Sequence, residues 1–188
     1  MTLTSQSKRR SLRVLGIAAG AMLLATPSSR AQGSSCATVH AASLKMEAVP
    51  YHMYFVDSAK AVAAENGGKP MVGESIVVGG AMYLLSHGKW VKSPVSLAQM
   101  NAERDKHDWT KDTCSHVRDE SVNGEAASVW RTHVVTEMST VDTEMWISKG
   151  RGVVLKANSV MDLGGQDGKN HTSARYDYSN VHPPAGVR

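Results

Sequence analysis

The sequence predicts an α+β domain built on one curved antiparallel sheet. We expect an open half-barrel of about nine strands with one or two helices packed against its concave face. Apolar side chains alternate along short segments, which is typical of strands with one buried face. The turns between these segments are short, and short hairpins make neighbouring strands antiparallel. The chain does not alternate strands with helices, which argues against a doubly wound parallel sheet.

The N-terminal segment has the order of a secretory signal peptide. Basic residues at 8–13 precede an apolar run of 12 residues, 14–25, and the small-residue sequence Ser29-Arg30-Ala31 follows. The apolar run is shorter than the about 20 residues of a membrane span. We therefore expect cleavage after Ala31, the alternative being an uncleaved anchor. The pair Arg9-Arg10 also fits twin-arginine export, so the sequence leaves the export route open.

Cleavage divides the chain into a signal peptide, 1–31, and a single half-barrel domain, 32–188. Five of the 21 Lys and Arg residues lie in the signal peptide, which leaves 16 basic against 17 acidic side chains in the domain. This balance provides no electrostatic basis for binding nucleic acid or an anionic membrane surface. We expect a periplasmic or secreted protein with no nucleic-acid partner and no transmembrane anchor after processing.

Both cysteines of the chain, Cys36 and Cys114, lie in the exported part. In an oxidising compartment an even number of cysteines predicts a disulfide. It would close a loop of nearly eighty residues, which the loop-entropy model values at up to roughly 4.5 kcal/mol. The alternative is two unpaired buried thiols.

Periodicity and turn residues give the expected elements. Apolar spacings of three and four predict a helix over 36–47, ended by Pro50, and Ser93-Pro94 opens a second helix that runs to about Arg104. The expected strands, in chain order, are 51–59, 71–78, 81–86, 90–92, 114–120, 126–137, 142–149, 153–163 and 170–178.

The buried face of this sheet is unusually rich in methionine. The mature chain has one Phe and eight of the ten Met residues. Methionine is flexible and suits surfaces that accept varied apolar shapes, although it also fills irregular cores. Alternation places Met145 and Ile147 on one face, and Val153, Leu155, Ala157 and Met161 on one face of the following strand. The candidate cavity lining is Met53, Phe55, Ile76, Val78, Met145, Ile147, Val153, Leu155 and Met161.

Motifs for enzyme chemistry are missing from the sequence. There is no Gly-x-Ser-x-Gly elbow and no His-Glu-x-x-His zinc pattern. Cys114-Ser115-His116 would place Cys114 and His116 on one face of a strand, where they could bind copper or zinc. A disulfide cysteine beside a surface histidine is the simpler interpretation. We therefore expect no enzyme activity, no metal and no cofactor.

The order of elements resembles the periplasmic LolA/LppX-like superfamily of lipoprotein and lipid carriers. The resemblance covers most of residues 36–182 and includes "YLLSHGKWVKSP", "DESVNGE", "TEMWISKGRGVVLK" and "RYDYSNV". It implies an open antiparallel half-barrel lidded by helices, with an acyl-binding hydrophobic cavity between sheet and helices. In the lipoprotein carrier proper, an arginine on an early strand holds the lid closed. The expected strands 51–59 and 71–78 contain no arginine, so this role is not carried over.

The resulting hypothesis is an exported binding protein that holds a lipid or another hydrophobic ligand in a half-barrel cavity. Its partner would be a hydrophobic small molecule or an acyl chain. The alternative is an envelope protein-interaction or stress-sensing module that uses the same scaffold without a lipid and binds another envelope protein. A hydrolase ranks third, because the sequence supplies no assembled nucleophile.

Overall fold

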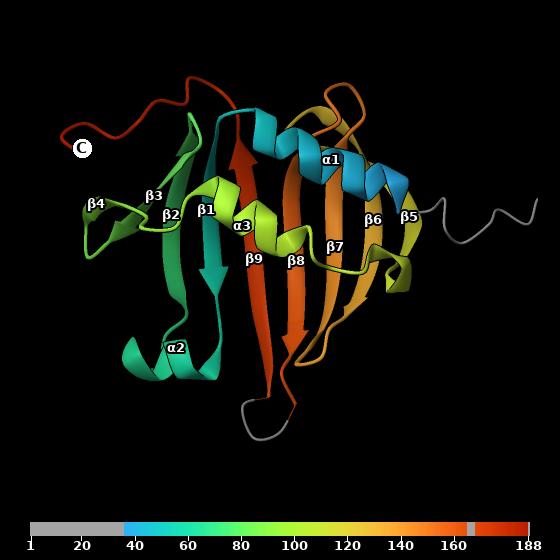
Figure 1. Cartoon of the computed structure of the whole chain (residues 1–188), viewed down its shortest axis with the longest axis horizontal. Helices are drawn as coiled ribbons and strands as arrows, with labels where there is room; N and C mark the ends of the chain where they lie inside the picture. The colour runs from blue at the N-terminus through green and yellow to red at the C-terminus, as the bar shows by residue number, and fades with distance from the viewer. Residues whose placement is uncertain (1–35, 165–167, 188) are drawn as a thin grey trace, which may run out of the picture.

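The computed structural model describes residues 36–164 and 168–187, so the expected signal peptide and its cleavage site lie outside the described residues. Nine strands form one antiparallel sheet in the order β4-β3-β2-β1-β9-β8-β7-β6-β5, which Figure 1 shows from the side of the helices. The sheet does not close, since β4 and β5 are its two edges. The predicted fold class is confirmed. The strands are β1 Tyr51–Asp57, β2 Met71–Val78, β3 Ala81–Ser86, β4 Lys89–Lys92, β5 Thr113–Val122, β6 Glu125–Val135, β7 Thr140–Ser148, β8 Val154–Asp162 and β9 Lys169–Asp177.

Sequential hairpins build most of the sheet. The exception is β9, which lies between β1 and β8 and so joins the first four strands to the last four. Both of its pairings are antiparallel. The strand that arrives last in the chain therefore occupies the middle of the sheet, and the half-barrel is incomplete without it.

Two helices cross one face of the sheet, which we call the helix face; the other is the open face. α1, Ala37–Ala48, lies across the strands beside α3, Leu97–Arg104 (Figure 1). α3 begins at Leu97, three residues after Pro94, where the sequence predicted the start of this helix. Ser96 and Gln99 form a capping box there, because the Ser96 hydroxyl accepts from the Gln99 amide while the Gln99 side chain accepts from the Ser96 amide.

The connections contain two short elements that the periodicity did not predict. α2, Lys60–Glu65, lies between β1 and β2, and the 3-10 helix Trp109–Lys111 precedes β5. Both are too short to show an apolar period. None of the helices in the described ranges is long and apolar enough to cross a bilayer.

The core has one apolar cluster on each face. Under α1, Val39 and Ala42 pack against Ile147, Val154 and Ala157 of the sheet. The cluster on the open face is formed by Ala127, Val129, Trp146, Val153 and Leu155.

A β-bulge decides which residues of β8 belong to each cluster. Trp146 pairs with Lys156, but Ile147 pairs with Val154, so two residues of β8 oppose one residue of β7 at this point. The predicted face of Val153 and Leu155 is therefore wrong. The extra residue turns both side chains to the open face, away from Ala157 and Met161.

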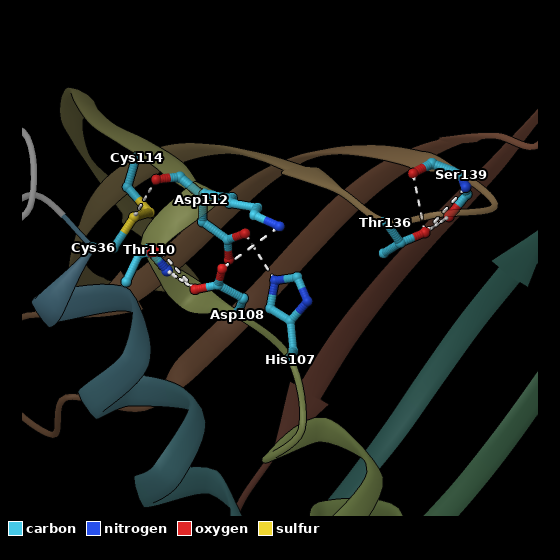
Figure 2. A network of polar contacts seen from close by, with 9 residues as sticks. Cys36, His107, Asp108, Thr110, Asp112, Cys114, Thr136 and Ser139 are labelled. Atoms are coloured by element: carbon cyan, nitrogen blue, oxygen red, sulfur yellow. Dashed lines mark hydrogen bonds and ion pairs between the residues drawn. A yellow bond between two sulfur atoms is a disulfide. The ribbon is translucent and has the colours of Figure 1, made fainter.

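α1 is fixed to the sheet at its start by the disulfide between Cys36 and Cys114 of β5, whose Cα atoms are 5.0 Å apart (Figure 2). The segment that leads into β5 is held by His107, whose Nε2 lies 2.8 Å from a carboxylate oxygen of Asp112. Near the end of α1, Glu47 accepts a 2.7 Å hydrogen bond from Asn101 of α3. The helix is thus tied to the edge strand at one end and to α3 at the other.

Replacing Cys36 with serine should lower the free energy of unfolding under oxidising conditions. The disulfide closes a loop with a sequence separation of 78 residues, so the loop-entropy model gives a loss of about 4 kcal/mol. Urea denaturation of the mature protein without reductant measures it. Wild-type protein unfolded with dithiothreitol is the control and should match the variant. An unchanged midpoint would contradict the disulfide's role.

Candidate functional site

The methionines of the sheet are gathered on one face. Residues an even number of positions apart on a strand share a face, as do direct cross-strand partners. Met145 packs against the α1 cluster, and its partner Ala157 shares that face with Met161. Met53 pairs with Tyr176, which also packs against the α1 cluster.

The same rule places the remaining strand methionines. Met53 pairs with Ser75, four positions from Met71, and Met82 pairs with Val77, two positions from Ser75. All methionines that lie in strands are therefore on the helix face: Met53, Met71, Met82, Met145 and Met161.

None of these methionine side chains is fully buried. Met71 is 36% and Met161 is 38% exposed, and the other three are half-buried. α1 makes its main sheet contact with β8, so much of the helix face near β1, β2 and β3 lies beyond it. Phe55 adds an aromatic ring to this region. The ring lies over Gly73, where a Cβ would come within 2.3 Å of the Phe55 Cζ atom. The helix face is apolar and only partly covered.

One buried hydroxyl on this face has no partner in the part of the chain that the structure describes. Ser75 of β2 is 1% exposed, and its Oγ has no hydrogen-bond partner among the described residues. Met53 and Leu84 lie directly opposite it on the two neighbouring strands. A buried hydroxyl without a partner costs about 1–3 kcal/mol relative to a satisfied one.

Two tyrosines lie in the neighbourhood of Ser75 on the helix face, Tyr51 opposite Val77 and Tyr176 on the far side of Met53. The rings of Tyr51 and Tyr176 pack edge to face with centroids 5.7 Å apart. Burial raises the pKa of Tyr51, and burial together with the neighbouring Tyr51 raises the pKa of Tyr176 to about 12. Neither hydroxyl bonds to another described residue, whereas the Tyr178 hydroxyl donates to the Val154 carbonyl at 2.5 Å. The rings are therefore held by packing, and their hydroxyls remain available.

The open face carries a groove of about 1020 Å³ that runs from β1 and β2 to the β5–β6 turn. Its lining is strongly charged, and each glutamate has a basic side chain as its partner. Glu74 lies 3.0 Å from His52, Glu120 lies 2.8 Å from Arg118, and Glu125 lies 2.8 Å from Arg151. The charged lining residues are Glu74, Glu120, Glu125, Arg151, Lys156, Arg175 and Asp177.

Two cations in this groove have aromatic partners instead. Lys156 and Arg175 are directly opposite each other on β8 and β9. The Lys156 ammonium lies 4.4 Å from the ring centre of Trp146, and the Arg175 guanidinium lies 4.2 Å from that of Tyr54. Like charges placed directly opposite on a sheet repel each other. The middle of the groove is therefore polar and cationic, and an acyl chain would desolvate these charges on binding there.

The nine predicted lining residues are divided between the two faces. Met53, Phe55, Met145, Ile147 and Met161 lie on the helix face, and that they line a cavity stays a prediction. The remaining four lie on the open face: Ile76, Val78, Val153 and Leu155.

Sequence reasoning missed Ser75, Tyr51 and Tyr176, because a missing hydrogen-bond partner leaves no mark in a sequence. Met82 could have been found from its position in the strand after the Gly79-Gly80 turn. His116 bonds to Asp119 at 3.0 Å, and Cys114 is in the disulfide. The described ranges contain no group of three or more potential metal-ligating side chains.

Comparison with solved structures finds the same fold, an open antiparallel sheet with helices across one face, in lipoprotein LppX. The sequence matches no family model, and no curated protein matches it. Lipoprotein LppX of Mycobacterium tuberculosis superposes with a TM-score of 0.52 at 10% identity, over 81% of this chain and 99% of LppX. LprF of Mycobacterium bovis gives a TM-score of 0.43 at 10% identity, over 80% of this chain and 96% of LprF. The MucA/MucB complex of Pseudomonas aeruginosa gives 0.41 at 13% identity, over 81% of this chain and 59% of that one. The protein is thus a distant structural relative of LppX, as the resemblance implied, and the likeness concerns the fold.

Replacing Ser75 with alanine should stabilise the ligand-free protein. The change removes a buried hydroxyl that has no partner and keeps the Cβ, so the free energy of unfolding should rise by about 1 kcal/mol. Ser159→Ala is the matched control, since that hydroxyl lies on the same face and bonds to Thr143 at 2.9 Å. The control should lose stability in the same urea titration. A loss of stability in both variants would show that Ser75 is satisfied in solution.

The contact between Glu125 and Arg151 should make stability depend on pH. The hydrogen bond from Arg151, with a smaller contribution from Ser148, holds the pKa of Glu125 below its ordinary value of 4.5. Because the folded-state pKa is the lower one, the contact stabilises the protein above about pH 4.5 and this stabilisation is lost as the pH falls through the folded-state pKa.

We expect Glu125→Gln to lower the free energy of unfolding at pH 7 by about 0.5–1 kcal/mol. The difference from wild type should shrink as the pH is lowered below about 4.5. Glu137→Gln, a change of an exposed carboxylate in the β6–β7 turn, is the control and should have no effect at neutral or acidic pH. A pH-independent difference for Glu125→Gln would contradict the ion pair.

Proposed function

We propose that this protein is an exported, non-enzymatic binding protein that holds the hydrocarbon part of a lipid or another hydrophobic ligand on its helix face. One observation carries the proposal: every strand methionine lies on that face, and none is fully buried. A folded core normally buries such side chains. Flexible, polarisable side chains that stay partly accessible suit an apolar ligand of variable shape.

The energetics favour a long chain as the ligand. Each buried methylene contributes about 0.8 kcal/mol, and the ligand loses translational and conformational freedom on binding. The chain would lie along β1, β2, β3 and β9, beneath α3 and the end of α1. The similarity in fold to lipoprotein LppX and the resemblance to a superfamily of lipid carriers support this assignment. Export rests on the sequence of residues 1–31.

A second candidate function is recognition of another envelope protein, and the groove of the open face favours it. The groove is wide and carries charges of both signs, with Lys156 and Arg175 at its centre and no carboxylate paired to either among the described residues. An acidic polypeptide segment would neutralise these two cations, whereas a hydrocarbon would not.

Native mass spectrometry of the mature protein, purified from periplasm without detergent, tests the first candidate. A stable adduct that extracts into organic solvent is the expected result. A clean mass without adduct that persists after incubation with lipids would overturn lipid binding and favour the second candidate.

Replacing Met53 with glutamine should weaken binding of a pyrene-tagged hydrocarbon about tenfold. The substitution keeps the side chain's length but adds an amide that an apolar ligand cannot satisfy, at a cost of about 1–3 kcal/mol. Fluorescence titration of the delipidated protein measures the dissociation constant. Val72→Gln is the control, because Val72 is 76% exposed on the open face of the adjacent strand. Equal effects of the two variants would contradict binding on the helix face.

A further inference from the structure

The helix face holds one fully buried polar side chain that the fold itself does not use. Ser75 is 1% exposed and its Oγ has no hydrogen-bond partner among the described residues. Most buried polar side chains have a partner, and an exception calls for an explanation such as an unfilled ligand contact. Ser75 stands in the middle of β2, with four residues of the strand before it and three after it.

The surroundings of Ser75 on the sheet are uncharged. Its direct partners are Met53 and Leu84, and its neighbours on the same face of β2 are Gly73 and Val77. Beyond Met53 on the next strand lies Tyr176, which packs against Tyr51. Each tyrosine has a hydroxyl that makes no bond to a described residue.

Two charged side chains of the overlying helices are paired with each other. Glu47 of α1 forms an ion pair with Arg104 of α3 and accepts a hydrogen bond from Asn101. These groups hold the two helices together. Arg104 is therefore not free to pair with an anionic headgroup beside Ser75, and the Lys45 ammonium of α1 lies beside Gly152, between β7 and β8.

We infer that Ser75 is the polar anchor of the ligand site, and that its hydroxyl bonds to an uncharged oxygen, a hydroxyl or a carbonyl, of an otherwise hydrophobic ligand. Tyr51 and Tyr176 supply further hydroxyls on the same face. This inference rests on the proposed function and specifies its ligand class as a neutral lipid. A fatty-acid anion would have to bury its carboxylate without a cationic partner, which is strongly unfavourable.

Access to Ser75 requires neighbouring side chains to move. Met53 lies directly opposite and has three rotatable side-chain bonds, so it can change rotamer at low cost. A site built to bond a ligand oxygen discriminates against an analogue that lacks it, because the protein hydroxyl is then left buried and unpaired. Ser75 therefore allows the methionine-rich face to select ligands that carry an oxygen atom.

The test compares three ligands of equal chain length on the delipidated mature protein. Hexadecane, 1-hexadecanol and palmitate at pH 8 each displace the pyrene-tagged hydrocarbon in a fluorescence competition assay. Wild type should bind hexadecanol at least about tenfold more tightly than hexadecane or palmitate. Ser75→Ala should lose most of the preference for the alcohol while its affinity for hexadecane stays unchanged. Tyr176→Phe should reduce the preference by a smaller factor, and Ser159→Ala should keep it.

Two results would overturn the inference while leaving the proposed function intact. One is a wild-type protein that binds hexadecane as tightly as hexadecanol, or palmitate more tightly than either. The other is a Ser75→Ala variant that keeps the full preference for the alcohol. A wild-type protein that does not bind the hydrocarbon probe at all would overturn the proposed function and the inference together.

Discussion

The attachment of α1 across the sheet is the constraint on which the rest of the molecule depends. The disulfide from Cys36 fixes the start of the helix to β5, and the contacts of Glu47 with α3 fix its end near β1. Between these points the helix buries Val39 and Ala42 against β7 and β8. Because α1 is only long enough to cover one half of the sheet, α3 is the helix that covers the helix face of β1, β2 and β3. That short helix has one buried apolar side chain, Leu97.

The two faces of the sheet consequently differ in chemistry. On the open face, long charged side chains lie over small or aromatic side chains. Lys156, for example, covers the ring of Trp146. Such a face shields its apolar cluster without a helix, because lysine and arginine cover apolar surface with their aliphatic stems. The helix face has no comparable charged cover on the sheet and depends on the helices. The two helices cover this face only in part.

The sequence predicted most of this architecture and only part of the site. Alternation and turn residues placed β2 and β3 at their observed bounds, because those strands are short, regular and flanked by glycine turns. They failed for Val153 and Leu155, where a β-bulge that no residue type marks reverses the faces. Alternation and turn residues could not identify Ser75 either. What distinguishes Ser75 is that its hydroxyl has no hydrogen-bond partner among the described residues, and tertiary packing decides whether a side chain has one.

The retention of an unpaired hydroxyl in an apolar face also limits what kind of protein this is. A sheet selected only for stability would place alanine or valine at the position of Ser75, since either would remove the cost of burying the hydroxyl. Local rules of folding are most often broken where function requires it. Methionines that stay partly exposed break a second rule on the same face, and they do so on the strands that flank Ser75. Two departures of different kinds on one face, with regular packing under α1 beside them, are what the proposed binding of an outside molecule to this face would explain.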